Sequence, residues 1–390
     1  MGEFHVLIIG GGGTGGALAH DLALRGFRVT LVERGEVTSG TTGRHHGLLH
    51  SGARYAVKDQ ESALECIDEN QVLRRIAPGT FEENDGLFVA VTEEDVAYGH
   101  LLMEGCGDCG IAAERLTREQ ALRLEPNLSP NLIMAIRIPD ATMDAMRMPL
   151  RFFATAQQNG TTVKTYTEVR AVLKQNDVVT GVQVTDHRSG QTYDIGADLV
   201  VNAAGPWCGK IAEMVGVEVP IRPSPGVMLA LKGRLCNMVI NRMTPSGDGD
   251  IVVPQRGLSV VGTSSWVVDD PDNLGLPPDH IQKMYDEGAK MIPLVKQVPF
   301  RAAWSAARPL IGPRRADADT GRELSRTFKC FDHVDEGVEG FVTITGGKAT
   351  TLRGMAEATA DVVCRKLGVD APCRTREVVL LPYTAYYANA

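Results

Sequence analysis

The chain has 390 residues, of which 43% are hydrophobic, and a formal net charge of −8. This length allows two domains with a sizeable core, and the acidic balance argues against a general nucleic-acid-binding protein, although it permits a small basic pocket for an anionic substrate. No stretch approaches the roughly 20 apolar residues that a membrane-spanning helix needs. Eight scattered cysteines favour a reducing cytoplasm. Because strand-like sequence begins at Val6, we expect no signal peptide.

The first elements predict a dinucleotide-binding unit. A buried strand over Val6–Ile9 runs directly into the motif Gly10-x-Gly12-x-x-Gly15, and a helix is expected over 16–25. In this motif the first glycine permits the tight turn, the second lets the backbone approach a pyrophosphate, and the third lets the helix pack on the strand. The helix N-terminus adds unpaired N–H groups and a partial positive charge for the phosphates.

The region after the second strand indicates which dinucleotide is bound. That strand, Val29–Val32, ends in Glu33, where an acidic side chain is placed to accept hydrogen bonds from an adenosine ribose. In the following segment, Thr38–Tyr55, small and hydroxyl residues precede three histidines and two arginines. Such a wrap suits a permanently enclosed flavin better than a transient nicotinamide, so we predict FAD as the cofactor.

The remaining elements alternate between helical and extended patterns. Helices are expected over 59–77, over 148–158, over 281–292 and from 348 to a C′ glycine at Gly368, and the capping box Thr117-x-x-Gln120 begins a short one. Strands are expected at 86–91, 163–166, 169–173, 178–185, 191–195, 198–202 and 341–345. We interpret Cys106 and Cys109 as two ordinary thiols near a helix end, with a redox or metal role as the alternative, and the residues after Leu381 as surface or disordered.

These elements predict an α/β protein with two domains. A Rossmann-like, discontinuous FAD-binding domain is expected from residues 1–80, 140–220 and 335–373. A substrate domain with a mixed or antiparallel sheet is expected from 81–139 and 221–334, followed by a tail over 374–390. The flavin is expected between the two domains, where such pockets usually form.

Six blocks of sequence carry a resemblance to a known family. They are Ile8–Gly12, Gly43–Val57, Val201–Gly205, Ala307–Leu310, Leu324–Arg326 and Thr343–Lys348. In this order, over residues 4–373, the chain resembles the FAD-dependent glycerol-3-phosphate dehydrogenases within the glycine oxidase and D-amino-acid oxidase group, and above all the catalytic A-type subunits of the bacterial anaerobic enzymes. Catalytic subunits of this type continue into a Cys-rich C-terminal domain that this sequence does not contain, which leaves the route of electron transfer open.

The resemblance implies a reaction and a set of substrate residues. Hydride would pass from C2 of sn-glycerol 3-phosphate to flavin N5, and electrons would continue to a quinone through electron-transfer or membrane-anchor subunits, on the cytoplasmic side and peripheral to the membrane. His50 is the expected base, with His46 as the runner-up and a packing or cofactor-contacting histidine as the alternative. The phosphate is expected to bind a cationic set, which comprises Arg308 as a catalytic and binding residue, Arg326, Lys348 and Arg54, with Tyr55 lining the pocket. We interpret Arg314 and Arg315 as a solvated loop.

Further residues are expected to hold the flavin. Gly346 and Gly347 open a helix whose N–H groups would stabilise negative charge on the reduced ring, and Lys348 could serve either flavin or substrate. The other expected cofactor contacts are Thr14, Arg34, Thr41, Thr42, His46, Gly47, Leu49, Val169, Ala204, Gly205 and Thr350. No metal site is expected.

Two rival functions stay open. The first is an FAD-dependent oxidase or dehydrogenase acting on a 2-hydroxy acid or an amino acid, whose carboxylate needs a smaller cationic set. The second is a flavin-holding subunit that relays electrons without a substrate of its own.

Overall fold

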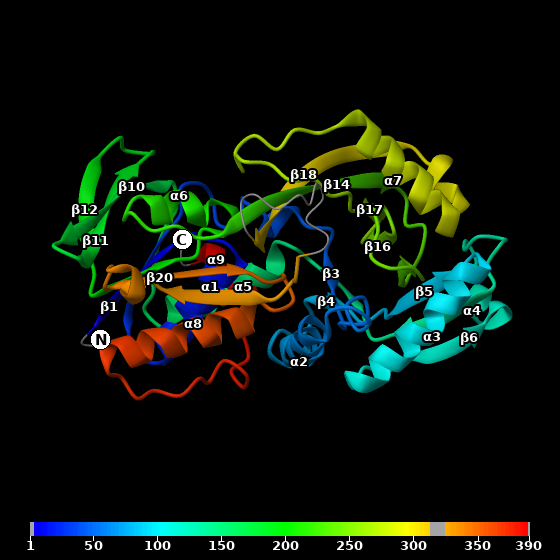
Figure 1. Cartoon of the computed structure of the whole chain (residues 1–390), viewed down its shortest axis with the longest axis horizontal. Coiled ribbons are helices and arrows are strands. Elements are labelled where there is room, and N and C mark those ends of the chain that lie inside the picture. The colour runs from blue at the N-terminus through cyan, green and yellow to red at the C-terminus, as the bar shows by residue number, and fades with distance from the viewer. Residues whose placement is uncertain (1–3, 313–323, 389–390) are drawn as a thin grey trace.

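The computed structural model describes residues 4–312 and 324–388, so the Arg314–Arg315 pair lies outside the described residues (Figure 1). Its first sheet has six strands in the order β19-β20-β13-β1-β2-β9, parallel except for the β19–β20 pair. The strands are β1 (His5–Ile9), β2 (Arg28–Val32), β9 (Thr162–Lys164), β13 (Leu199–Asn202), β19 (Phe328–Asp332) and β20 (Phe341–Gly346). All five residues of β1 are buried, as expected for the centre of a parallel sheet covered on both faces.

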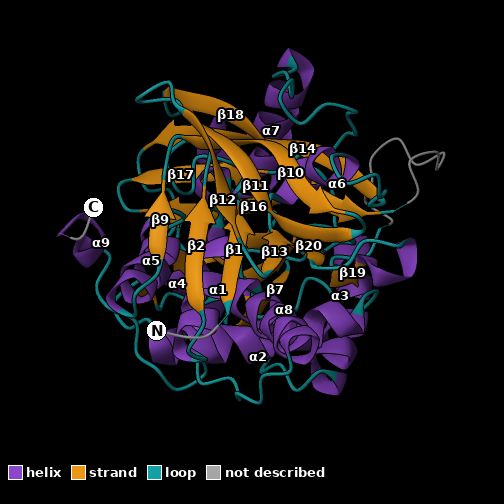
Figure 2. Ribbon diagram, turned by 90° about the vertical axis from the view of Figure 1, so that its left-hand side faces the viewer, coloured by secondary structure: helices purple, strands orange, loops and turns teal. Residues whose placement is uncertain are grey.

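Alternate residues of β1 identify the layers on the two faces of this sheet (Figures 1 and 2). Val6 and Ile8 pack in one core with helices α1 (Gly13–Leu24), α5 (Arg147–Gln158) and α8 (Leu352–Leu367). Leu7 and Ile9 pack in a second core on the other face. That face is covered by α6 (Cys208–Glu213) and by a three-stranded antiparallel sheet of β10 (Thr167–Gln175), β11 (Val178–Asp186) and β12 (Thr192–Gly196).

A second, eight-stranded sheet forms the other half of the molecule. Its order is β18-β14-β17-β16-β15-β5-β7-β6, and among these pairs only β15–β5 is parallel. The strands are β5 (Gly86–Ala90), β6 (Glu114–Thr117), β7 (Met134–Ile138), β14 (Ile221–Lys232), β15 (Val239–Arg242), β16 (Ile251–Gln255), β17 (Leu258–Gly262) and β18 (Phe300–Ile311). Helices α3 (Glu93–Asp108), α4 (Arg118–Leu124) and α7 (Pro278–Met291) accompany it (Figure 1).

Short elements join the two halves. A small sheet of β3 (Leu48–Leu49), β4 (Phe81–Glu82) and β8 (Ala141–Met143) lies beside α2 (Gln60–Ile76) (Figure 1). The described residues also form four 3₁₀ turns, η1 (Thr42–Arg44), η2 (Gly205–Trp207), η3 (Pro293–Lys296) and η4 (His333–Glu336), of which η3 follows α7 and η4 connects β19 to β20. The fold class expected from the sequence is confirmed: a parallel dinucleotide-type sheet stands beside a mixed, mainly antiparallel one.

Helix boundaries follow the capping residues. Asp59 caps α2 by accepting a hydrogen bond from the Ser62 N–H, and Gly368, with φ of 66°, ends α8 as expected. The capping box of α4 is confirmed. Helix α1 begins three residues earlier than expected, because Gly12 is its N-cap. Helix α3 ends at Asp108, between the two cysteines that were expected near a helix end, but its start was not predicted, although Thr92 and Asp95 form a capping box there.

One expectation about chain organisation was wrong. Residues 328–332 were assigned to the substrate domain, but β19 pairs with β20 at the edge of the first sheet. The residues after Leu381 were expected to be surface or disordered, and as far as Ala388 most of them lie at the surface. There α9 (Thr384–Ala388) packs against α5, and Tyr386 is 5% exposed with its ring 6.0 Å from that of Phe153. A few isolated apolar anchors hold this tail, so it has no periodic pattern by which to recognise it.

Within residues 4–312 and 324–388, no helix combines the length and the apolar sequence that a bilayer span requires.

Candidate active site

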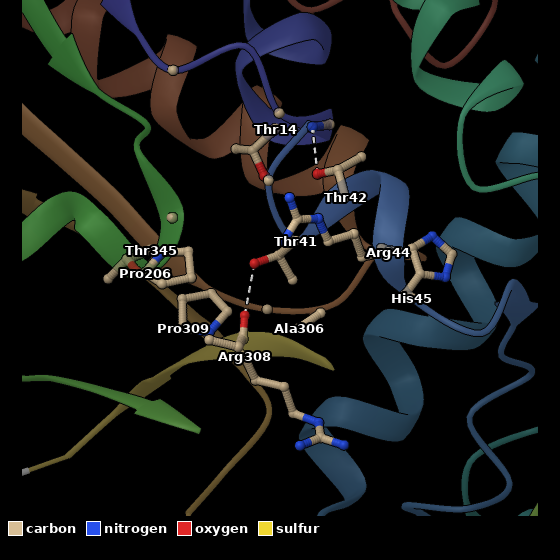
Figure 3. Close-up of a pocket in the computed structure, with 18 of the residues that line it drawn as sticks. Thr14, Thr41, Thr42, Arg44, His45, Pro206, Ala306, Arg308, Pro309 and Thr345 are labelled. Atoms are coloured by element: carbon tan, nitrogen blue, oxygen red, sulfur yellow. Dashed lines mark hydrogen bonds between the residues drawn. The ribbon is translucent and has the colours of Figure 1, made fainter. Parts of the chain in front are cut away.

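A cavity of about 720 Å³ lies between the two halves. One side is formed where β1, β13 and β20 end and α1 begins. The other side is formed by β18, by residues between β15 and β16, and by residues that follow β17. Figure 3 shows Thr41, Thr42 and Arg44 on one wall and Ala306, Arg308 and Pro309 facing them from β18. This size lies within the range of cofactor pockets, and the position matches the expected one between the domains.

The strand–turn–helix end of the cavity has the geometry that a dinucleotide requires. Gly10 has φ of +114°, and a Cβ there would lie 2.6 Å from the Ala203 carbonyl oxygen, so no other residue fits. The Glu33 carboxylate accepts hydrogen bonds from the N–H groups of Gly11 at 2.7 Å and Gly35 at 2.8 Å. These bonds fix the carboxylate at the cavity wall, ready to accept further donors from a ribose. The described residues therefore fit the adenosine and pyrophosphate of FAD.

Hydrogen bonds fasten the segment after β2 to both halves (Figure 3). The Thr42 hydroxyl accepts the Gly13 N–H of α1 at 3.0 Å, whereas the Thr41 hydroxyl donates to the Ala307 carbonyl of β18 at 2.7 Å. The Trp304 indole N–H donates to the Arg44 carbonyl at 2.6 Å. Thr41 is thus a bridge to the second sheet as well as a residue of the cavity wall.

Most of the expected cofactor residues line this single cavity. They are Gly10, Gly12, Thr14, Glu33, Arg34, Thr41, Thr42, His46, Val169, Ala204, Gly205, Gly346, Gly347 and Lys348. Four others do not line it: Gly15, Gly47, Leu49 and Thr350. The Thr350 hydroxyl instead accepts the His50 N–H at 3.1 Å, and Gly47 accepts a hydrogen bond from Gln255 at 3.3 Å, so both support the wall from behind.

The three histidines of this segment are close to one another and neutral. Burial, reinforced by the charges of Arg54 and Lys348, lowers the pKa of His50 to about 3, and burial lowers that of His45 to about 4. Burial and the neighbouring histidines hold the pKa of His46 well below its usual range. The ring centroids of His46 and His50 are 6.1 Å apart.

Hydrogen bonds from backbone N–H groups determine which nitrogen carries the proton in two of these rings. Nδ1 of His45 accepts the Gly47 N–H at 2.9 Å, and Nδ1 of His46 accepts the Leu48 N–H at 3.2 Å. A backbone N–H can only donate, so each of these neutral rings carries its proton on Nε2. No hydrogen bond from a described residue occupies either ring nitrogen of His50. His50 therefore has a nitrogen available to accept a proton, whereas His46 presents a donor.

The expected phosphate-binding cations all line the cavity. The Arg308 guanidinium is held by Thr263 Oγ1 and by backbone carbonyls, including those of Ser224 and Ser264 at 3.3 Å. Lys348 Nζ lies 2.8 Å from the Arg326 carbonyl, 3.2 Å from a Glu65 carboxylate oxygen and 5.2 Å from the centre of the Tyr55 ring.

Arg54 was expected to bind the phosphate, but its guanidinium is already paired with a carboxylate of the protein. It forms a buried ion pair with Asp250, whose carboxylate raises the pKa of Arg54 against the opposing effect of burial. Asp250 also accepts the Gly247 N–H at 2.6 Å. Four cations and the two carboxylates of Asp250 and Glu65 thus meet here, which leaves a positive excess for an anionic ligand.

Several cavity residues were not identified from the sequence. Asp250, Thr263, Trp207, Lys210 and Asp272 all line the wall. Trp207 was visible as the end of the Ala203–Trp207 turn, but its contacts come from distant segments. Nothing local to Asp250 or Asp272 distinguishes them from other acids in loops.

Cys106 and Cys109 are buried free thiols, and burial raises the pKa of Cys106 to about 12. Among the residues that the structure describes, no group of three or more His, Cys, Asp or Glu side chains is placed to hold a metal ion. The interpretation of this pair as ordinary thiols stays a prediction.

Comparison with known proteins identifies the family. The family of FAD dependent oxidoreductases matches residues 5–362. The chain belongs to this family. Two relatives are the A1 subunit of the anaerobic glycerol-3-phosphate dehydrogenase of Haloferax volcanii, 43% identical over 95% of this chain, and the A subunit of the Escherichia coli K12 enzyme, 42% identical over 96%. The flavoprotein spans 65% and 69% of the length of those two relatives.

A solved structure shows the same fold. The glycerol-3-phosphate dehydrogenase from Bacillus halodurans, complexed with FAD, superimposes on the flavoprotein with a TM-score of 0.72 at 23% identity. The match covers 97% of this chain and 67% of that one. The resemblance given by the six sequence blocks is therefore confirmed at the level of the family, the fold and the FAD cofactor.

Proposed function

We propose that the flavoprotein oxidises sn-glycerol 3-phosphate to dihydroxyacetone phosphate. The observation that carries this proposal is the convergence of Arg54, Arg308, Arg326 and Lys348 on the cavity that holds His50. Four cations are more than a carboxylate substrate needs, and they suit a phosphate dianion. The relatives at 42–43% identity are named for this activity, which supports the same substrate here.

The roles of the residues follow from their contacts. FAD, when bound, accepts the hydride that leaves C2 of the substrate. The cations bind the phosphate ester and orient C2, and the C2 hydroxyl proton passes to an imidazole nitrogen of His50. His46 presents its Nε2–H as a hydrogen-bond donor in the same cavity.

Phosphate binding also prepares the base. An imidazole whose pKa is about 3 is neutral but accepts a proton poorly, and part of this lowering comes from Arg54 and Lys348. A phosphate dianion bound to those cations offsets their charge and so removes their part of the lowering of the His50 pKa, while the larger part, which comes from burial, remains. The phosphate of the substrate thus assists proton transfer as well as binding.

We further propose that electrons leave the reduced flavoprotein for a quinone through partner subunits, at the cytoplasmic face of the membrane. The named relatives are subunits of a larger enzyme, which supports the need for partners.

The proposal is tested by anaerobic mixing of the FAD-loaded protein with sn-glycerol 3-phosphate, glycerol or L-lactate while the visible flavin band is followed. Bleaching by the phosphate ester alone is the expected result. Bleaching by L-lactate would support the hydroxy-acid rival. No bleaching by any of them, with yellow protein in the cuvette, would support an electron-relay role.

A further inference from the structure

A segment of the second half reaches across the dinucleotide end of the cavity. Residues 263–277 connect β17 to α7, and Figure 1 shows this loop extending back towards α6. Its first part is tied to β14, because the Trp266 and Val268 N–H groups donate to carbonyls of that strand. Further along, Pro271, Asp272 and Leu274 line the cavity together with Glu33 and Arg34. The segment thus lies over the end where the adenosine of FAD is expected.

Asp272 fastens this segment to the first half. One carboxylate oxygen accepts hydrogen bonds from Arg34 at 2.8 Å and from the Trp207 indole N–H at 2.7 Å, and the other accepts one from Lys210 at 2.7 Å. Lys210 also binds Asp270 at 2.8 Å, and Asp270 accepts the Asp272 N–H. The three donors come from two segments of the dinucleotide half: Arg34 directly follows Glu33, and Trp207 and Lys210 lie in the consecutive elements η2 and α6.

The donors are themselves packed together. The Arg34 guanidinium lies 4.5 Å from the centre of the Trp207 ring, an arrangement that adds a cation–π attraction. Trp207 also lies against Gly40, in the segment that leads to Thr41 and Thr42. Arg34, Trp207, Lys210 and Asp272 therefore form one contiguous cluster, which we call the clasp, at the rim of the cavity.

The charge state of the clasp is constant over the working pH range. Although burial opposes it, hydrogen bonds from Lys210, Arg34 and Trp207 together lower the pKa of Asp272 to about 2. The carboxylate is ionised at any pH at which the protein is used, so salt rather than pH controls these contacts.

We propose that the clasp controls the release of FAD, because the Asp272 segment has to detach from Arg34, Trp207 and Lys210 before the adenosine end can leave. Each of these contacts is half-exposed and weak alone, but the three converge on one carboxylate and have to break together. Opening is a transient local event, and FAD leaves only while the segment is open. The proposal rests on FAD binding and not on the identity of the substrate.

The test measures FAD release directly. The FAD-loaded protein is diluted, and the fluorescence of free FAD is followed for wild type, Asp272→Asn and the control Asp269→Asn. Asp269 is exposed on the same segment, and no ion pair or hydrogen bond joins it to a described residue. We expect release to be about five- to tenfold faster in Asp272→Asn and unchanged in Asp269→Asn. Lys210→Met should show a smaller acceleration.

Salt provides a second test that needs no variant. Ion pairs at this exposure are screened, so wild-type release should accelerate between about 0.05 and 1 M NaCl, and Asp272→Asn should respond less. Equal release rates for wild type and Asp272→Asn would overturn the proposal, and so would slower release in the variant, which would mean that Asp272 repels FAD electrostatically. If Asp272→Asn does not fold, a salt-independent wild-type rate together with an unchanged Lys210→Met rate would overturn it equally.

Discussion

The two ends of the cavity hold their ligands with different parts of the chain. At the dinucleotide end the contacts come from the main chain: a glycine turn, the first N–H groups of α1, and a carboxylate fixed by two backbone donors. At the substrate end they come from side chains, three histidines and four cations, delivered by several elements. A site built mainly on the backbone should fail when a glycine is lost, whereas a side-chain site should lose chemistry without losing FAD.

The largest expected effect is at the base. His50→Ala should slow flavin reduction by sn-glycerol 3-phosphate about 10²- to 10⁴-fold, because it removes the nitrogen that accepts the C2 hydroxyl proton. FAD content should stay at the wild-type level. Stopped-flow reduction in a single turnover measures the rate, and His46→Gln serves as the comparison, with a smaller loss expected. Near-normal reduction in His50→Ala would move the base to another residue.

The next effect is on substrate binding. Arg308→Ala should raise KM for sn-glycerol 3-phosphate by about 10- to 100-fold, since it removes charge-assisted hydrogen bonds to the phosphate, while FAD stays bound. Arg301→Ala is the matched control, because Arg301 is an exposed arginine on the same strand, β18. Initial rates over a range of substrate concentrations give both constants. An unchanged KM would remove Arg308 from the phosphate site.

At the dinucleotide end the sensitive position is a glycine. In Gly15→Ala the new Cβ would overlap the Gly10 carbonyl oxygen, so α1 has to shift away from the turn. We expect loss of bound FAD and a loss of roughly 1–3 kcal/mol in the free energy of unfolding.

The control for that variant is Gly107→Ala. Gly107 is exposed on α3 in the other half, with open space around its Cβ position, and should gain about 0.5–1 kcal/mol from improved helix propensity. Urea unfolding measures the stability of both variants, and the ratio of flavin to protein absorbance measures their FAD content. Full FAD occupancy in Gly15→Ala would contradict a site built on the backbone.

The stability of the protein should also depend on pH, because two of the cavity histidines are buried in the neutral form. The pKa values of His45 and His50 in the folded protein are about 4 and about 3, below the unfolded value near 6.5. Between these limits the unfolded chain binds more protons, so stability is complete above about pH 6.5 and falls as the pH drops towards 4. The slope is about 1.4 kcal/mol per pH unit for each proton taken up.

Urea unfolding at about pH 7 and pH 5, with a fixed excess of FAD, measures this slope. His50→Gln should flatten it, whereas His100→Gln, which alters an exposed histidine on α3, should leave it as in wild type. The same slope in both variants would show that the pKa of His50 does not change on folding.

The difference between the two ends also explains which parts of the cavity could be predicted from the sequence. The dinucleotide end could be predicted because its strand, turn, helix and acid follow one another directly between Val6 and Glu33, and each residue type has a local physical reason. The roles of Asp250 and Asp272 could not be predicted, because their partners Arg54 and Arg34 are about 200 residues away in the sequence. Only the folded structure brings each pair together. The position of β19 was missed for a different reason: its partner β20 is close in the sequence, but no strand was expected over Phe328–Asp332.

The placement of β1 has a consequence for synthesis of the chain. This strand is synthesised before the other strands of its sheet, but its neighbour β13 follows about 190 residues later, and β20, which completes the sheet around the cavity, later still. Until then the nascent β1–α1–β2 unit exposes unpaired apolar strand edges, a state that favours aggregation and chaperone binding. FAD can therefore be captured only after β20 has been synthesised, so the supply of flavin in the cell should influence how much of this protein folds rather than aggregates.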